Sequence, residues 1–402
     1  MYKKELSSFR KAIVGIQFLF VAFGAIVLVP LLVGLDPSTA LFTAGIGTII
    51  FHLVTKGRVP IFLGSSFAFI APIISASKQW GMPGTLFGII GVSLVYFVMA
   101  ALIKWKGKKI LDKLFPPVVI GPVIILIGLS LSASAVDMAK TNWFLAFISL
   151  FVAVMILSLG RGLLKLVPIV CGIIVGYVVA IIFGEVDFTG VKAAPWLALP
   201  TAISNFHLPH FSWEPFLFMI PVAIAPVIEH IGDIYVVSSV ADKKFSKDPG
   251  LHRTMLGDGL ACLFASFFAG PPVTTYSEVT GAMSITKITN PQVIRISAFT
   301  AIIFSVIGKL SALLQSIPTA VLGGIMLLLF GSIASVGIQN LISNKVDVSD
   351  TRNTIIISIT LTLGIGGAVI NYGEFAMSGI GLSAIIGVIL NLLLPKSNKG
   401  SK

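Results

Sequence analysis

Two acidic residues stand inside an apolar stretch of membrane-spanning length, residues 221–240. Glu229 and Asp233 are four residues apart, so they share one face of a helix. An ionised side chain at the centre of a bilayer costs about 3 kcal/mol, and such residues usually face a protein-lined cavity. The pattern predicts a binding or ion-coupling site; a carboxylate that closes a helix–helix hydrogen bond is the alternative. His230 points about 100° away from Glu229, which favours a packing or interface role.

Glu278 is a further acidic residue in an apolar stretch, residues 272–287. The sequence around it, GPPVTTYSEVTG, is rich in Pro, Gly and β-branched residues, and GSSFAFIAP at residues 64–72 is also a poor ordinary helix. Such backbone at membrane depth is tolerated only where protein or a cavity satisfies its N–H and C=O groups. We therefore expect short extended segments that cross near the membrane midplane, each leading into a half-helix that aims backbone donors at a ligand.

Polar and aromatic residues on these extended segments are expected to line the site. They are Ser65, Ser66, Phe67, Tyr276 and Ser277, beside Glu278. For the serines the alternative is a hydrogen bond between helices, and for the two aromatic residues it is packing.

Carboxylates beside backbone N–H groups and aromatic rings suit a flat, neutral ring with adjacent N–H and C=O groups. The carboxylates would accept from N–H groups, the amides would donate to C=O groups, and the rings would stack. Because Glu229 and Glu278 cannot both ionise cheaply at close range, one of them is expected to hold a proton and could carry a coupled one. The site would repel an anion and suits a sugar poorly.

The composition is that of a polytopic membrane protein, since 56% of the 402 residues are hydrophobic and 11% are charged. Two cysteines, Cys171 and Cys262, both in apolar runs, indicate neither a disulfide framework nor a metal site. The N-terminal residues lack a signal-peptide cleavage pattern, so we expect them in the mature protein. Because neither catalytic spacings nor a G-x-x-x-x-G-K-[ST] loop occur, an enzyme, a cofactor and ATP-driven transport are not expected.

Apolar runs separated by turn and charge signals predict an all-α protein with 14 membrane spans. The first seven are residues 12–34, 38–55, 60–77, 84–103, 117–136, 142–160 and 166–184. A long polar and aromatic connection, residues 185–215, separates them from the second seven. These are residues 216–240, 254–269, 272–287, 293–315, 318–338, 353–371 and 376–395.

The basic residues predict the orientation of these spans. If both termini are cytoplasmic, all but four of the 28 Lys and Arg residues fall on the cytoplasmic side, as expected for a membrane protein. The four on the outer side are Lys78, Lys140, Lys192 and Lys309. The net charge of +12 therefore sets the orientation and does not argue for nucleic acid.

Ordered matches between the two halves indicate an internal repeat. Residues 60–66 (PIFLGSS) align with residues 272–278 (PVTTYSE), and the same offset places Gln17 on Glu229. A second match joins PPVVIG at residues 116–121 to PTAVLG at residues 318–323. Because each half has seven spans, an odd number, the repeat is inverted and predicts a site near the midplane between the halves.

At LGSSFAFIAP, IEHIGD and TTYSEVTGAMSITK the chain resembles the nucleobase:cation symporter family, which includes the bacterial uracil permeases and the nucleobase-ascorbate transporters. The resemblance covers nearly the whole chain. It implies two inverted halves of seven spans, with a core domain that holds the substrate and a gate domain that supports it. The core domain would comprise residues 12–103 and 216–315, and the gate domain residues 117–184 and 318–395.

The resemblance also implies roles for individual residues. Glu229 and Glu278 would hydrogen-bond the pyrimidine ring. The backbone at Phe67 and Ser277 and the side chains of Ser66 and Tyr276 would complete the pocket, and Phe330 replaces a gate-domain tyrosine. Glu278 is the uracil-like residue, since xanthine transporters usually carry Gln there.

The chain departs from the family's pattern at several positions. Gln17-Phe18 replaces a Gln-His pair, and Val273 and Val279 replace asparagines. Asp233 replaces a histidine that is common in uracil permeases, although the nucleobase-ascorbate branch commonly has Asp there. We expect Glu278 to carry the coupled proton, with Asp233 tuning it; a proton carried by Asp233 is the alternative.

The sequence thus predicts a proton-coupled importer of uracil that works by alternating access. Xanthine or uric acid is the nearest alternative substrate, and sodium is the alternative coupling ion. An anion transporter of the same architecture is less favoured, because the site carries carboxylates and no intramembrane Arg. We expect a multi-pass protein of the cell (inner) membrane that forms a homodimer, as the family's gate domains commonly do. Spans 5 and 12 offer Gly-rich faces for such pairing.

Overall fold

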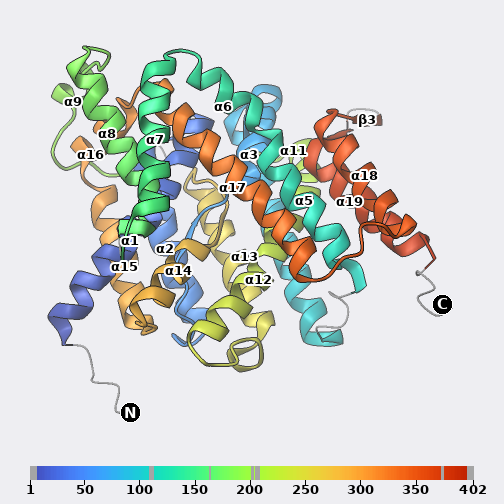
Figure 1. Ribbon diagram of the computed structural model, residues 1–402. Coiled ribbons are helices and arrows are strands. Elements are labelled where there is room, and N and C mark those ends of the chain that lie inside the picture. The colour runs from blue at the N-terminus through green and yellow to red at the C-terminus, as the bar shows by residue number, and fades with distance from the viewer. Residues whose placement is uncertain are drawn as a thin grey trace.

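Apolar helices make up most of the molecule (Figure 1). The computed structural model describes residues 7–107, 113–162, 164–200, 203, 209–372 and 375–395. Seven lysines of the predicted cytoplasmic set lie outside the described residues: Lys3, Lys4, Lys108, Lys109, Lys396, Lys399 and Lys402. Most of residues 201–208 in the predicted outer connection lie outside them as well.

The elements follow the order of the predicted spans. The helices are α1 (Ser8–Val33), α2 (Pro37–Val54), η1 (Phe67–Phe69), α3 (Ile70–Lys106), α5 (Pro117–Ser130), α6 (Ser132–Ala139), α7 (Trp143–Leu159), η2 (Leu164–Leu166), α8 (Pro168–Ile182), α9 (Thr189–Ala193), α11 (Trp213–Val222), α12 (Ile224–Val240), η3 (Ser246–Gly250), α13 (Leu251–Phe267), α14 (Ser277–Thr286), α15 (Pro291–Ser305), α16 (Gly308–Gln315), α17 (Thr319–Ser343), α18 (Thr351–Ile365) and α19 (Gly379–Leu393). The strands are β1 (Leu63–Ser65), β2 (Val273–Thr275), β3 (Val369–Tyr372) and β4 (Phe375–Ser378).

Short polar residues and prolines begin several of these helices. Asp36 caps α2 by accepting a hydrogen bond from the backbone N–H of Ser38, with Pro37 in the first helical position. Asn290 caps α15 in the same way, followed by Pro291. A side-chain oxygen that satisfies a free N–H and a proline that needs none are both favoured at this end of a helix.

Within the described residues, six helical segments are long and apolar enough to cross a membrane. They are Ser8–Val33, Pro37–Val54, Phe67–Lys106, Pro117–Ala139, Trp213–Val240 and Thr319–Ser343. Five further apolar helices, α7, α8, α15, α18 and α19, are shorter. The molecule is therefore an integral membrane protein with several spanning helices, and the number of 14 spans stays a prediction.

Two of the predicted spans, residues 60–77 and 84–103, meet within α3, which runs from Ile70 to Lys106. Its backbone is not helical at Gly81, where φ is 70° and ψ is 173°, so two helices meet there. A positive φ is accessible to glycine at little cost. The predicted boundary between these spans therefore takes the form of a kink.

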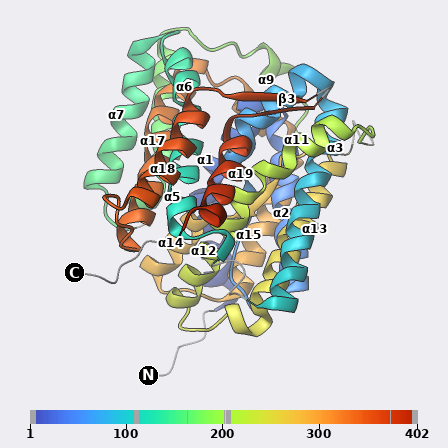
Figure 2. The same cartoon turned by 90° about the vertical axis from the view of Figure 1, so that its right-hand side faces the viewer.

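The helices pack as two groups. In the first, α2 packs against α13 and α15, α3 packs against α11 and α13, and α1 packs against α15. In the second, α17 packs against α5, α6 and α7, and α18 packs against α5 and α19. Figure 2 shows α5, α6, α7, α17 and α18 on its left and α2, α3, α11 and α13 on its right.

Glycines bring α5 and α17 into close contact within the second group. A Cβ on Gly128 would lie 2.4 Å from the carbonyl oxygen of Phe330, and one on Gly337 would lie 2.6 Å from that of Gly121. Side chains at these positions would separate the two helices. The Gly-rich faces of spans 5 and 12 thus pack against each other inside the chain, so they do not supply a free surface for a dimer.

Candidate functional site

The strands β1 and β2 pair in an antiparallel manner and confirm the predicted extended segments. Leu63 lies opposite Thr275, Gly64 opposite Thr274, and Ser65 opposite Val273. Backbone bonds continue the pairing on both sides, from the Ser66 N–H to the Pro272 oxygen at 2.9 Å and from the Tyr276 N–H to the Phe62 oxygen at 3.0 Å. The two segments, far apart in the chain, thus satisfy each other's backbone groups.

Side chains of surrounding helices satisfy further polar groups of this strand pair. The Leu63 N–H donates to the Thr48 hydroxyl of α2 at 2.9 Å, and the Cys262 thiol of α13 donates to the Val273 oxygen at 3.0 Å. The hydroxyl of Thr275 donates to a carboxylate oxygen of Asp233 at 2.5 Å. Buried backbone and hydroxyl groups need such partners, and three helices supply them here.

Each strand leads directly into the N-terminal end of a helix. β1 is followed by η1 and α3, and β2 is followed by α14, which begins at Ser277. The first N–H groups of a helix have no partner within that helix, and its N-terminal end carries partial positive charge. Two sets of backbone donors are therefore available beside the crossing strands.

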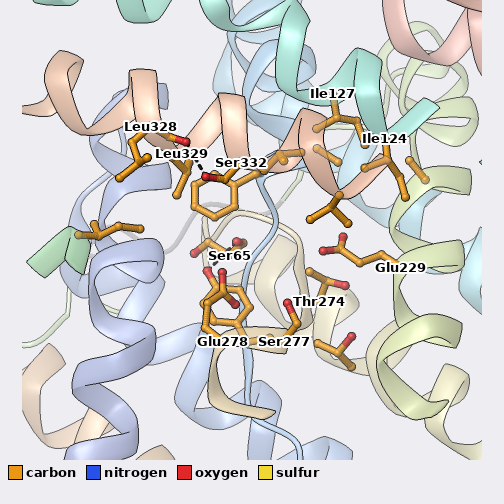
Figure 3. Close-up of a pocket in the computed structure, with 18 of the residues that line it drawn as sticks. Ser65, Ile124, Ile127, Glu229, Thr274, Ser277, Glu278, Leu328, Leu329 and Ser332 are labelled. Atoms are coloured by element: carbon orange, nitrogen blue, oxygen red, sulfur yellow. Dashed lines mark hydrogen bonds between the residues drawn. The ribbon is translucent and has the colours of Figure 1, made fainter. Parts of the chain in front are cut away.

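A cavity of about 280 Å³ lies beside the crossing. The strand segments and α12 contribute Ser65, Phe67, Ala68, Ala225, Glu229, Thr274, Thr275, Tyr276, Ser277 and Glu278. Figure 3 shows Glu229 and Glu278 on different sides of this space, on separate segments of the chain. Both carboxylates keep accessible surface because they face the cavity.

The opposite wall of the cavity comes from the second group of helices and is almost wholly apolar. It consists of Ile124, Ile127, Leu157, Pro168, Ile169, Leu328, Leu329, Ser332, Ile333 and Val336. Among the described residues that line the cavity, none is basic. With two carboxylates and no cation facing it, such a cavity disfavours the ionisation of both at once.

Six of the predicted site residues meet at this cavity: Ser65, Phe67, Glu229, Tyr276, Ser277 and Glu278. Ser66 is buried next to them, and its hydroxyl oxygen has no hydrogen-bond partner among the described residues. Asp233 is buried one helical turn beyond Glu229, where it accepts from Thr275. Phe330 is 2% exposed within α17. The last three do not line the cavity in this structure, and their predicted roles remain predictions.

Tyr276 has a packing role as well as a place in the cavity wall. Its hydroxyl donates to the backbone oxygen of Ser65 at 2.8 Å, which ties β2 to β1. Its ring lies against Gly64, where a Cβ would be 2.4 Å from the ring carbon Cζ. Only glycine leaves room for the ring, so Gly64 and Tyr276 are matched across the strand pair.

His230 faces away from the cavity and joins α12 to α13. Its Nδ1 is 2.8 Å from Asp258 Oδ2, and its Nε2 is 2.9 Å from the hydroxyl oxygen of Thr254. Because that hydroxyl donates to the Leu251 carbonyl oxygen, Nε2 must carry a proton and donate to Thr254. Nδ1 and Asp258 then share one further proton. The interface role predicted for His230 is confirmed.

Sequence reasoning missed Asp258, Thr274 and Thr275. Asp258 is the only acidic residue in the predicted span 254–269, the same signal that singled out Glu278. The two threonines belong to β2 and both line the cavity, and Thr275 also donates to Asp233. Among the described residues, no group of three or more His, Cys, Asp or Glu side chains could hold a metal ion.

The fold is that of known membrane transporters. It superposes on the structure of SLC26A9 with a TM-score of 0.69 at 11% identity, over 95% of this chain and 64% of that chain. It superposes on the transmembrane domain of BicA, a cyanobacterial bicarbonate transporter, with a TM-score of 0.62 at 15% identity, over 95% and 96%. Fold and apolar helices together define an integral membrane protein, and the fold by itself assigns no function.

A family model described as Permease family (Xan_ur_permease) matches residues 9–372. The chain is 50% identical to the probable uracil permease of Pasteurella multocida (strain Pm70), over 98% of this chain and 95% of that protein. It is 46% identical to the uracil permease of Bacillus caldolyticus (95% and 91%) and 38% identical to that of Escherichia coli (strain K12) (94% and 90%). The chain belongs to this family, the nucleobase:cation symporter family.

Proposed function

We propose that this protein imports a nucleobase, uracil first among them, together with a proton. The observation that carries the proposal is the cavity in which Glu229 and Glu278 lie beside the helix N-termini that follow β1 and β2. Uracil presents two N–H and two C=O groups in one plane. The carboxylates can accept from the N–H groups, while backbone N–H groups at Phe67 and Ser277 can donate to the C=O groups.

The names of the relatives support uracil as the substrate, because the three proteins compared above are called uracil permeases or a probable one. The departures from the family's pattern do not argue against it. Val273, Val279, Asp233 and Phe330 do not line the cavity, so none of these departures puts a new side chain on its wall. No contact of the described lining favours xanthine or uric acid over uracil.

Proton coupling is supported by the charge of the site. Glu229 and Glu278 face one cavity whose described lining contains no basic residue, and Asp233 lies one turn from Glu229. We propose that Glu278 gains a proton before the neutral base binds. Asp233 acts on the site through Thr275, which lines the cavity.

Alternating access is supported by the two walls of the cavity. The polar wall comes from residues 12–103 and 216–315, the proposed core domain, and the apolar wall comes from residues 117–184 and 318–395, the proposed gate domain. We propose that the core domain moves against the apolar wall and exposes the site to each side in turn. An inverted repeat, cytoplasmic termini and a homodimer belong to this proposal.

The fold that this chain shares with a bicarbonate transporter raises anion transport as a second candidate. The cavity does not favour it, because its charged groups are carboxylates. An anion would be repelled by both Glu229 and Glu278 unless each were protonated.

The test is uptake of radiolabelled uracil into proteoliposomes under an imposed proton gradient, with a sodium gradient as the comparison. Unlabelled xanthine, uric acid, adenine and sulfate serve as competitors. We expect accumulation that depends on the proton gradient and is inhibited only by close pyrimidines. Stronger competition by xanthine would move the substrate to the purines, and competition by sulfate would overturn the nucleobase assignment.

A further inference from the structure

A second cavity, of about 680 Å³, lies among the turns at one end of the molecule, at the bottom of Figure 1. Three segments that are distant in the chain line it: the turn after α2, the segment between α12 and α13, and the start of α15. Its lining consists of Gly57, Arg58, Lys243, Lys244, Phe245, Lys247, Asp248, Asn290, Pro291, Gln292 and Arg295.

The charge of this cavity is strongly unbalanced. Five of its lining residues are basic, and Asp248 is the one acidic residue among them. The carboxylate of Asp248 forms an ion pair with Arg58. Among the described residues, no other carboxylate forms an ion pair with the cations of this cavity. Lys243, Lys244 and Lys247 are exposed and Arg295 is half-buried, so the cavity presents uncompensated positive charge.

The start of α15 adds to the positive potential. Asn290, Pro291 and Gln292 line the cavity, so the N-terminal end of this 15-residue helix borders it. Such an end carries partial positive charge, although Asn290 already accepts the N–H groups of Gln292 and Val293. Lys11 donates to the side-chain oxygen of Gln292 at 2.8 Å, which brings a further cation to the margin.

Packing holds the cations around the hollow. Phe245 is 2% exposed, and its N–H donates to the Ser238 hydroxyl at 3.2 Å, which anchors the segment that carries the lysines. Gly57 has a φ of 63°, and a Cβ there would lie 3.5 Å from Nη1 of Arg295. The guanidinium thus lies directly under the turn after α2. Basic loops are common on one side of membrane proteins, but here three of them converge on one cavity.

We propose that this basic cavity binds a phosphate-bearing anion. Phosphate oxygens accept hydrogen bonds from Lys and Arg side chains, which surround the hollow, and the positive end of α15 attracts their charge. An anionic lipid headgroup or a free phosphate compound would offer this chemistry. All three segments belong to the proposed core domain, so the ligand would link them and stabilise that domain as one unit.

The experiment measures the thermal unfolding midpoint of the purified full chain. One arm compares nanodiscs of phosphatidylcholine alone with nanodiscs that also contain phosphatidylglycerol. The other arm adds inorganic phosphate or uridine monophosphate in phosphatidylcholine nanodiscs, with chloride at equal ionic strength as the reference. Lys243→Ala/Lys247→Ala and Lys244→Ala/Arg295→Gln remove cations from the cavity. Lys104→Ala/Lys106→Ala is the matched control, because these lysines at the end of α3 do not line the cavity.

We expect one arm to raise the midpoint by several degrees in the wild type and in the control variant, and to lose at least half of that shift in both cavity variants. A response to phosphatidylglycerol alone identifies a lipid headgroup, and a response to soluble phosphate identifies a free anion. If neither arm shifts the wild type beyond chloride, or if the cavity variants respond like the control, the proposal is wrong. Because no transport is measured, this outcome is independent of the proposed substrate.

Discussion

Glu229 and Glu278 approach the cavity from different segments and can do different work there. Glu229 lies on α12, one turn before Asp233, while Glu278 is the second residue of α14. A carboxylate near a helix N-terminus is stabilised by the partial positive charge of that end. When Glu278 has released a proton, the start of α14 can stabilise its charge, so this carboxyl can pass between a protonated and an ionised form.

Glu278→Gln is expected to weaken uracil uptake by at least about tenfold, since the loss of one hydrogen bond of about 1.4 kcal/mol already lowers affinity by that factor. The amide keeps the size of the side chain but loses one acceptor and cannot carry the coupled proton. Initial rates of uptake in proteoliposomes measure the effect. Wild-type uptake would refute the assignment of Glu278 to the site.

Glu229→Ala completes this test, because it removes the second acceptor and should abolish uracil binding itself. Binding of radiolabelled uracil to the purified protein separates that effect from a transport defect. Glu185→Gln is the matched control, since Glu185 is exposed and lies outside the substrate cavity. A normal affinity in Glu229→Ala would count against the pocket.

At the scale of elements, the crossing of β1 and β2 decides what the site can present. Three residues on each strand are enough to pair the two segments and to start a helix from each. The two strand segments are not helical, so their geometry depends on hydrogen-bond partners in α2, α12 and α13. A change that separates the strands should therefore act on the substrate site.

Gly64→Ala makes such a change without adding a polar group. The new Cβ would lie 2.4 Å from the ring of Tyr276, so the ring must move. The hydrogen bond from the Tyr276 hydroxyl to the Ser65 backbone oxygen must then weaken. Overpacking of this kind costs about 1–3 kcal/mol. We expect a lower thermal unfolding midpoint and weaker uracil binding, measured on the same preparation.

Gly281→Ala is the control for that variant. Gly281 lies in α14, and nothing comes within 4 Å of a Cβ built there. This change should leave the unfolding midpoint and the uracil affinity close to those of the wild type. Equal effects of the two substitutions would mean that the contact between Gly64 and Tyr276 is not what matters.

At the scale of the whole molecule, the proposed core and gate domains meet at close contacts. Gly24 of α1 faces α8, and a Cβ on Gly24 would lie 3.4 Å from the Cβ of Ile169. This separation is close to the range that a disulfide requires. If the two domains move against each other during transport, a cross-link at this point should stop the cycle.

The double variant Gly24→Cys/Ile169→Cys tests this motion on a background without the native cysteines, Cys171→Ser and Cys262→Ser. The serine hydroxyl at position 262 keeps a donor for the Val273 oxygen. We expect oxidation to reduce uracil uptake by at least about tenfold and a reductant to restore it. The control pair, Gly47→Cys/Ala261→Cys, lies within the proposed core domain, where the corresponding Cβ atoms would be 3.2 Å apart, and its oxidation should leave uptake unchanged. Full uptake by the oxidised core–gate pair would exclude relative motion at this contact.

Much of the protein could be predicted from residue type and spacing. An ionised residue in an apolar span costs free energy, so the sequence predicts a functional role for Glu229 and Glu278. Both line the cavity. Pro, Gly and β-branched residues disfavour helix, so the extended segments at residues 63–65 and 273–275 were predictable as well. These inferences rest on local properties of the chain, which need no knowledge of its neighbours.

Only the tertiary structure decided which polar side chains share a site. Asp233 and Glu229 lie on one helix face. Asp233, however, accepts a hydrogen bond from the Thr275 hydroxyl, because β2 passes next to it. Gly-rich faces on α5 and α17 suggested a surface for another chain, yet they pack against each other. A helix periodicity states which residues share a face but not what covers that face, and the covering partner comes from a distant part of the chain.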